Sequence, residues 1–269
     1  MLYAYNALPL AEQVNLFALV FFFCVGIITL AIFSLRWKQR RRDQARSRGG
    51  TVITAEFFRE YFFFITFPFL KLCEIARLSP NTISAFSLFL GFVAAGSIAA
   101  GWFFWGGWAL AFSGMVDTLD GQIARLTGKV SARGAYLDSV FDRYADFAVF
   151  SAFLFYFGTG LSEITVVSGY VPAAAALAAL TGAALISYVK ERGANLGVRD
   201  ERGLMQRADR LLITCVMCIY DPAALLFAGM VFDEQQNNRY LTLIGLSVMA
   251  IVSHASAINR LRRIAKQLQ

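Results

Sequence analysis

The sequence is short of the residues that build zinc sites and disulfide frameworks, and it is short of charge. Its one histidine, His254, has no partners at ligand spacing, and among its four cysteines only Cys215 and Cys218 lie close in sequence, with two residues between them. Structural zinc sites take four ligands, so this composition argues against zinc, and we expect free thiols and a packing role for His254. Only 16% of the residues are charged and 58% are hydrophobic, with a mean hydropathy of +0.56. This is too apolar for an ordinary soluble domain and predicts several membrane-spanning helices.

The first apolar run does not look like a signal peptide. Residues 16–35 carry no charge and are long enough to cross a bilayer core. No basic residue precedes the run, whereas seven Lys and Arg residues follow it within Arg36–Arg48. This order predicts an anchor helix with its N-terminus outside and a basic linker inside. The Gly49–Gly50 pair looks like a hinge, so we divide the chain into an N-terminal anchor with its linker, residues 1–50, and a main domain, residues 51–269.

Beyond the hinge, the hydrophobic pattern predicts an all-α integral membrane bundle. Residues 54–78 have charges at both ends around an aromatic band, which favours an interfacial helix, with a short span as the alternative. Ser79 and Pro80 then form a helix start. Six spans follow, and we expect them at residues 82–100, 102–126, 134–158, 170–190, 209–231 and 239–260.

Four carboxylates interrupt this apolar background within 26 residues. Asp117 and Asp120 are three residues apart and share a helix face, and Asp138 and Asp142, four apart, share a face of the next helix. A charge at the centre of a span costs on the order of 2.5–3.5 kcal/mol on insertion scales, so such acids usually mark function. Two pairs on adjacent helices can converge on a hard divalent cation, which favours oxygen ligands. The alternative is that they serve only as ion-pair partners between spans.

Basic residues gather on the side of the bundle where these acids lie. Of the 25 Lys and Arg residues, 20 fall in four segments assigned to the inside: Arg36–Arg48, Arg125–Arg133, residues 190–210 and the C-terminal end. This bias predicts that the acids face the cytoplasm. We expect the protein to lie in a bacterial-type inner or plasma membrane. The net charge of +7 therefore points to anionic membrane lipids as partners and not to nucleic acid.

The acids and their neighbours together resemble the signature of the CDP-alcohol phosphotransferase family, also called CDP-alcohol phosphatidyltransferases. The pattern D-x2-D-G-x2-A-R-x8-G-x3-D-x3-D is present at every fixed position: Asp117, Asp120, Gly121, Ala124, Arg125, Gly134, Asp138 and Asp142. The resemblance implies a membrane enzyme of phospholipid synthesis, with residues 51–269 as its catalytic domain, and a homodimer. Such an enzyme transfers a substituted phosphoryl group from a CDP-linked lipid, such as CDP-diacylglycerol, to an acceptor alcohol and releases CMP.

The resemblance also implies roles for the motif residues. The expected metal ligands, for two Mg2+ or Mn2+ ions about 3.5–4 Å apart, are the four acids Asp117, Asp120, Asp138 and Asp142. Asp142 is in addition the expected general base toward the acceptor hydroxyl. The expected CDP-binding residues are Asn81, Thr82, Asp117, Asp120, Gly121, Ala124, Arg125, Gly134 and Asp138, where the small side chains leave room and Arg125 meets the diphosphate.

The acceptor is indicated by the residues around and after the last acid. Arg143–Asp146, Ser187–Arg192 and Gln206–Arg210 are similar to the branch that uses inositol phosphate or a related phosphorylated polyol, whereas residues 193–205 match no branch closely. A phosphomonoester needs several cations, ideally arginines for bidentate contact. The candidates are Lys129, Arg133, Arg143, Arg192, Arg207 and Arg210. Glycerol 3-phosphate or serine as acceptor, a cation or proton transporter with a carboxylate relay, and an inactive scaffold remain as alternatives.

Overall fold

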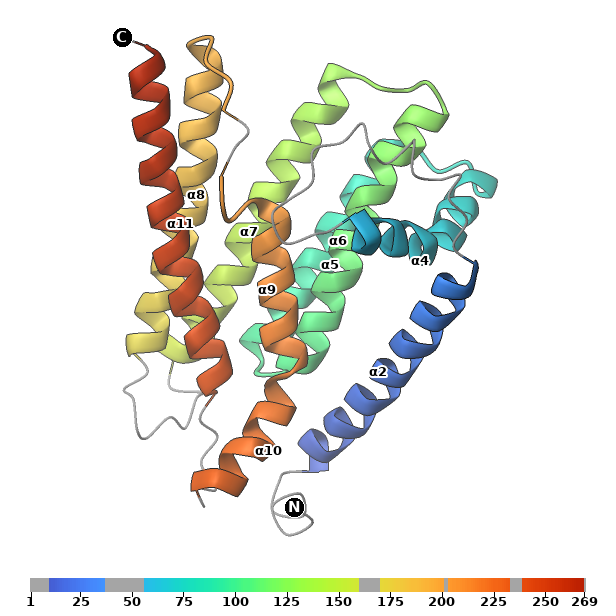
Figure 1. The fold of residues 1–269 in the computed structure, drawn as a ribbon, viewed down its shortest axis with the longest axis vertical. Helices are drawn as coiled ribbons and strands as arrows, with labels where there is room; N and C mark the ends of the chain where they lie inside the picture. The colour runs from blue at the N-terminus through green and yellow to red at the C-terminus, as the bar shows by residue number, and fades with distance from the viewer. Residues whose placement is uncertain (1–9, 37–55, 160–169, 201–202, 233–238, 269) are drawn as a thin grey trace.

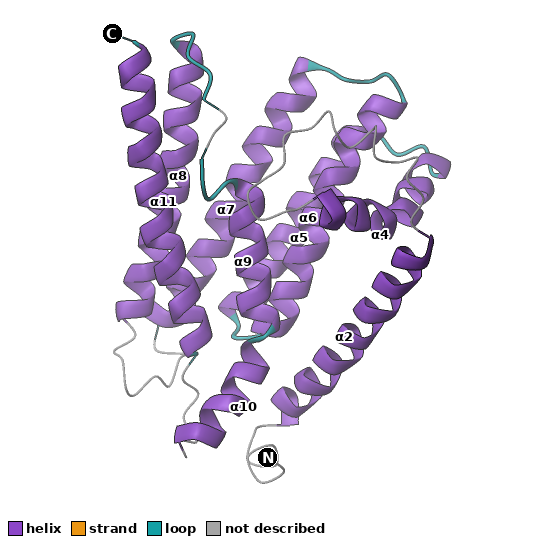
Figure 2. Cartoon of the chain, viewed as in Figure 1, coloured by secondary structure: helices purple, strands orange, loops and turns teal. Residues whose placement is uncertain are grey.

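The computed structural model describes residues 10–36, 56–159, 170–200, 203–232 and 239–268, and within them it is built from α-helices without strands (Figures 1 and 2). The all-α prediction is therefore confirmed. The helices are α2 (Leu10–Arg36), α4 (Glu56–Ile75), α5 (Pro80–Ala99), α6 (Phe103–Leu126), α7 (Ala132–Gly158), α8 (Tyr170–Asn195), α9 (Arg207–Ile219), α10 (Asp221–Phe232) and α11 (Tyr240–Gln267). The basic linker and the Gly49–Gly50 hinge lie outside the described residues.

The bundle is held together by close helix pairs. Helix α5 packs on α6 and α7, α8 packs on α11, and α6 packs on α9. Its core includes the fully buried Phe153, Ala176 and Leu246. Glycines allow close approaches between helices: a Cβ at Gly107 of α6 would lie 2.8 Å from Cβ of Cys218 of α9. Small residues at such contacts are typical of membrane bundles, because they let two helix backbones approach closely and pack well.

Four of the described helices are long and apolar enough to cross a membrane: α2, α5, α8 and α11. The pair α9–α10 makes a fifth if it is one span. Helices α6 and α7, which carry the acids, are not among these candidates. The protein is thus an integral membrane protein, while the count of six spans in the bundle stays a prediction.

The span expected at residues 209–231 is divided into two helices. Helix α9 ends at Ile219, α10 begins at Asp221, and the two are bent by 48°. Pro222 explains the break, since proline has no N–H and clashes with the preceding turn.

Two helices lie outside the main bundle. Helix α4 runs across the direction of the bundle helices, as the interfacial prediction requires, and Pro68 lies within it. Helix α2 runs along the side of the molecule from α4 to α10 and contacts both (Figure 1). Leu70 and Cys73 of α4 pack on a small buried cluster of α5 and α6, formed by Ile83, Val116, Leu119 and Ile123.

Candidate active site

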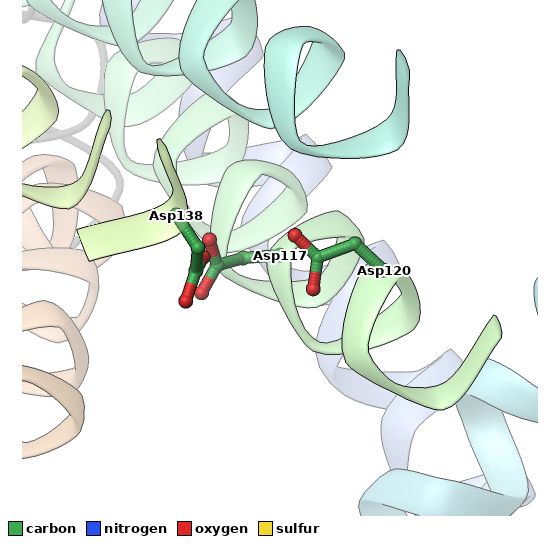
Figure 3. Close-up of side chains that lie close together, drawn as sticks. All are labelled: Asp117, Asp120 and Asp138. Atoms are coloured by element: carbon green, nitrogen blue, oxygen red, sulfur yellow. The ribbon is translucent and has the colours of Figure 1, made fainter. Parts of the chain in front are cut away.

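Three of the four acids meet between α6 and α7. Figure 3 shows Asp117 and Asp120 of α6 and Asp138 of α7 with their carboxylates turned toward one another. One oxygen of each lies within 4.8 Å of the other two. The helical spacing thus places the first pair on one face, and the packing of both α6 and α7 on α5 brings Asp138 to it. Because all three donors are carboxylate oxygens, the cluster fits a hard divalent cation such as Mg2+ or Mn2+.

Asp120 is held by a residue that sequence reasoning did not assign to the site. Its side chain is buried, and the hydroxyl of Ser84 on α5 donates a hydrogen bond to Asp120 Oδ2. Ser84 lies four residues after Pro80, at the end of the first turn of α5. The signal available in the sequence was the helix start at Ser79 and Pro80, which predicts no contact between Ser84 and a residue 36 positions away.

Asp142, the fourth acid, has a different partner. Nη1 of Arg207 lies 2.6 Å from Asp117 Oδ2, in a hydrogen bond, and 2.8 Å from Asp142 Oδ1, in an ion pair. Arg207 is the first residue of α9, so one guanidinium nitrogen links α6, α7 and α9. Asp142 is not a member of the three-carboxylate group in this arrangement.

A second arginine of α9 binds the next acid of α7. Nη2 of Arg210 donates to Asp146 at 2.8 Å, and its Nη1 donates to the carbonyl of Met205 at 2.9 Å. Arg143 lies 3.7 Å from the same Asp146 carboxylate. The start of α9 is fixed locally, because the backbone N–H of Gln206 donates to Asp209 Oδ2 at 3.0 Å, as in a capping box. Arg207 and Arg210, one turn apart, therefore both face the acidic side of α7.

The other predicted acceptor residues lie farther out. Lys129 and Arg133, around the connection from α6 to α7, and Arg192, near the end of α8, are exposed. None of the three forms an ion pair within the described part of the chain. The structure thus brings Arg143, Arg207 and Arg210 to the acids, and it leaves the other three at the surface.

The predicted CDP-binding residues fall into two neighbouring groups. At the start of α7, a Cβ on Gly134 would lie 3.6 Å from Asn81 Oδ1, so the N-terminus of α5 approaches this glycine. On α6, a Cβ on Gly121 would lie 3.4 Å from Nη1 of Arg125, and Ala124 is partly exposed beside it. Thr82 takes part in the cap of α5, where its amide donates to Oγ of Ser79 at 3.2 Å.

The chain matches the family model of the CDP-alcohol phosphatidyltransferases over residues 77–232. It is 36% identical over 165 residues to the phosphatidylinositol phosphate synthase of Mycobacteroides abscessus, covering 60% of this chain and 71% of that protein. It is 30% identical over 223 residues to the enzyme of the same name from Streptomyces avermitilis, covering 81% and 85%.

Solved structures agree on the fold. The Mycobacterium tuberculosis phosphatidylinositol phosphate synthase PgsA1 with CDP-DAG bound matches with a TM-score of 0.61 at 24% identity, over 74% of this chain and 93% of that chain. The same enzyme in complex with manganese and citrate also matches with a TM-score of 0.61, over 74% and 88%. These relatives do not favour glycerol 3-phosphate or serine as acceptor, and none of them supports the transporter alternative.

The intact motif, the carboxylate cluster between α6 and α7 and the matched sequences lead to one assignment. The chain belongs to the CDP-alcohol phosphatidyltransferase family, in its phosphatidylinositol phosphate synthase branch, and is a membrane transferase of substituted phosphate groups in phospholipid biosynthesis.

Proposed function

We propose that the protein transfers the phosphatidyl group of CDP-diacylglycerol to inositol phosphate and releases CMP. The observation that carries this proposal is the position of Arg207 beside the motif acids Asp117 and Asp142, with Arg210 one turn further along α9 at Asp146. Guanidinium groups at this place suit an acceptor that carries its own phosphomonoester, since arginine binds phosphate through two parallel hydrogen bonds. An uncharged acceptor would need no such cations. The names of the relatives agree with this choice of acceptor.

The metal site of the proposal uses Asp117, Asp120, Asp138 and Asp142. Divalent ions held there would cancel the charge of the donor diphosphate and hold the transferring phosphorus in line with the attacking oxygen. Mg2+ and Mn2+ both suit an all-oxygen site, and the manganese complex of PgsA1 makes Mn2+ a practical probe. Asp142 takes the proton of the acceptor hydroxyl, by proximity more than by basicity.

On the donor side, we assign the cytidine and diphosphate to the motif residues of α6 and to the facing starts of α5 and α7. Gly121, Ala124 and Gly134 leave space for the nucleotide, Asn81 and Thr82 line the other side, and Arg125 neutralises the diphosphate. On the acceptor side, Arg143, Arg207 and Arg210 form the inner set. Lys129, Arg133 and Arg192 form an outer set that attracts the anion.

The remaining proposals concern the setting of the enzyme. Residues 51–269 form the catalytic domain and residues 1–50 the anchor, with the active site toward the cytoplasm, the N-terminus outside and a homodimer as the assembly. Cysteine labelling from either side of the membrane tests the orientation: a cysteine introduced at exposed Lys129 should react from the cytoplasmic side only.

The function is tested with purified protein, CDP-diacylglycerol and Mn2+ by measuring CMP release with inositol 1-phosphate, inositol, glycerol 3-phosphate, serine or no acceptor. Turnover is expected with inositol 1-phosphate alone. It should be lost in Asp142→Asn and kept in Arg199→Gln, whose arginine is exposed and is not a predicted site residue. Turnover with glycerol 3-phosphate or serine instead would refute the acceptor assignment, and folded protein without CMP release would refute the reaction.

A further inference from the structure

The contact between Arg207 and two motif acids has a consequence for metal binding. A single nitrogen, Nη1, lies 2.6 Å from an oxygen of Asp117 and 2.8 Å from an oxygen of Asp142. These two carboxylates come from different helices, and both are assigned as metal ligands. A second ion shared by these two carboxylates, even one bound through the other oxygen of each, would lie close to the guanidinium. The ion and the guanidinium would then repel each other, since like charges repel strongly where little water screens them.

Charge balance supports the same competition. The four acids carry four negative charges, and Arg207 supplies one positive charge among them. Two divalent ions would neutralise the acids completely, and Arg207 would then lie beside cations with no acid left to bind. One divalent ion together with Arg207 leaves a residual negative charge. The arginine and the second ion are therefore alternatives and not companions.

Arg207 is also the less fixed of the two arginines at the start of α9. Arg210 is tied to Asp146 by one Nη and to the Met205 carbonyl by the other, so a backbone group holds it in place. The hydrogen bond and ion pairs of Arg207 go only to acids. The Nε atoms of both arginines are buried without a hydrogen-bond partner among the described residues, so the carbonyl of Met205 makes the difference between them. When the acids bind metal, nothing else in this set of contacts retains the guanidinium.

We propose that Arg207 is a latch that occupies the Asp117 and Asp142 oxygens until the second divalent ion binds, and that this ion releases its guanidinium to receive the phosphate of the acceptor. The inference rests on the proposed function for the identity of the acceptor, but its first step concerns only the acids, the arginine and the metal. Metal binding and acceptor binding then help each other, because each favours the released arginine, and such coupling is reciprocal.

The test is the affinity for Mn2+ of purified protein without donor or acceptor, measured by electron paramagnetic resonance of the free ion. Arg207→Gln removes the latch and should bind the weaker Mn2+ on the order of tenfold more tightly, which corresponds to a latch closed about nine-tenths of the time in the native protein. Arg199→Gln removes the same charge from an exposed position and should bind Mn2+ as the native protein does. Equal or weaker binding in Arg207→Gln would overturn the proposal.

A second variant covers the case in which Arg207→Gln does not fold. Arg207→Lys keeps the positive charge but has a single, shorter donor group, so it should also bind Mn2+ more tightly than the native protein, by a smaller factor. Unchanged or weaker binding in this variant would count against the latch. The Mn2+ titration contains neither substrate, so its result is separate from that of the CMP release assay: the latch can fail while turnover with inositol 1-phosphate stands, and the reverse.

Discussion

Arg239 and Asp221 form a buried ion pair at the end of the bundle where α6 begins, away from the acids near the end of α6. The guanidinium also donates to the Tyr156 hydroxyl and to the Gly101 carbonyl, both at 3.1 Å, and lies 4.2 Å from the centre of the Phe103 ring. Arg239 immediately precedes α11 and is only 6% exposed. The pair lies at the break between α9 and α10, because Asp221 is the first residue of α10.

Asp221→Asn or Arg239→Gln should each lower the free energy of unfolding by about 3–5 kcal/mol, since each leaves an uncompensated buried charge. The double variant should lose less than the sum of the two, because it leaves no lone charge. Thermal unfolding in detergent measures this, with the exposed Arg262→Gln on α11 as control. Single variants as stable as the control would show that the pair does not stabilise the bundle.

Ser84→Ala should weaken Mn2+ binding by about 10–100-fold, the usual effect of removing a group that orients a metal ligand. The reason is the hydrogen bond from Ser84 to Asp120, which fixes the buried carboxylate toward Asp117 and Asp138. A matched control is Ser87→Ala, one turn further along α5, whose hydroxyl donates to the Ser113 carbonyl at 3.0 Å. Ser87→Ala should leave Mn2+ binding unchanged, and equal effects of the two variants would contradict this role of Ser84.

Asp138→Asn should abolish CMP release and yet raise the thermal midpoint in the presence of a metal chelator by about 2–4 °C. Without metal, the carboxylates of Asp117, Asp120 and Asp138 repel one another within 4.8 Å, and the substitution removes one of the three charges. Adding Mn2+ should reverse the order, stabilising the native protein more than the variant. The exposed Glu191→Gln serves as the control for charge alone. A lower midpoint for Asp138→Asn in chelator would contradict the repulsion.

The chain shortened to residues 51–269 should keep its CMP release and lose thermal stability. Helix α2 contributes no side chain to the acid cluster, but it is tied to α4 where the Tyr61 hydroxyl donates to the Gly26 carbonyl at 3.0 Å. Glu12 also approaches Arg239 at 3.8 Å. The full-length Tyr61→Phe variant should show a smaller loss of stability in the same assay. Complete loss of turnover in folded, shortened protein would contradict the division into an anchor and a catalytic domain.

The helices and the acid-bearing face were predictable because both depend on local spacing. Apolar runs of about 20 residues favour membrane helices, and acids three or four residues apart share a face whatever surrounds them. The family motif also predicted the glycines of the site, Gly121 on α6 and Gly134 on α7. Even the break in the span at residues 209–231 had a local signal, Asp221–Pro222, although the length of the apolar run masked it.

The sequence by itself determined an all-helical membrane protein with the family motif at the junction of two helices. Only the tertiary structure decided which charges meet: Ser84 with Asp120, Arg207 with Asp117 and Asp142, and Arg239 with Asp221. The physical reason is that an ion pair between helices depends on how the helices are placed and rotated against each other. That placement follows from the packing of the whole core, and it cannot be deduced from the spacing of residues within one helix.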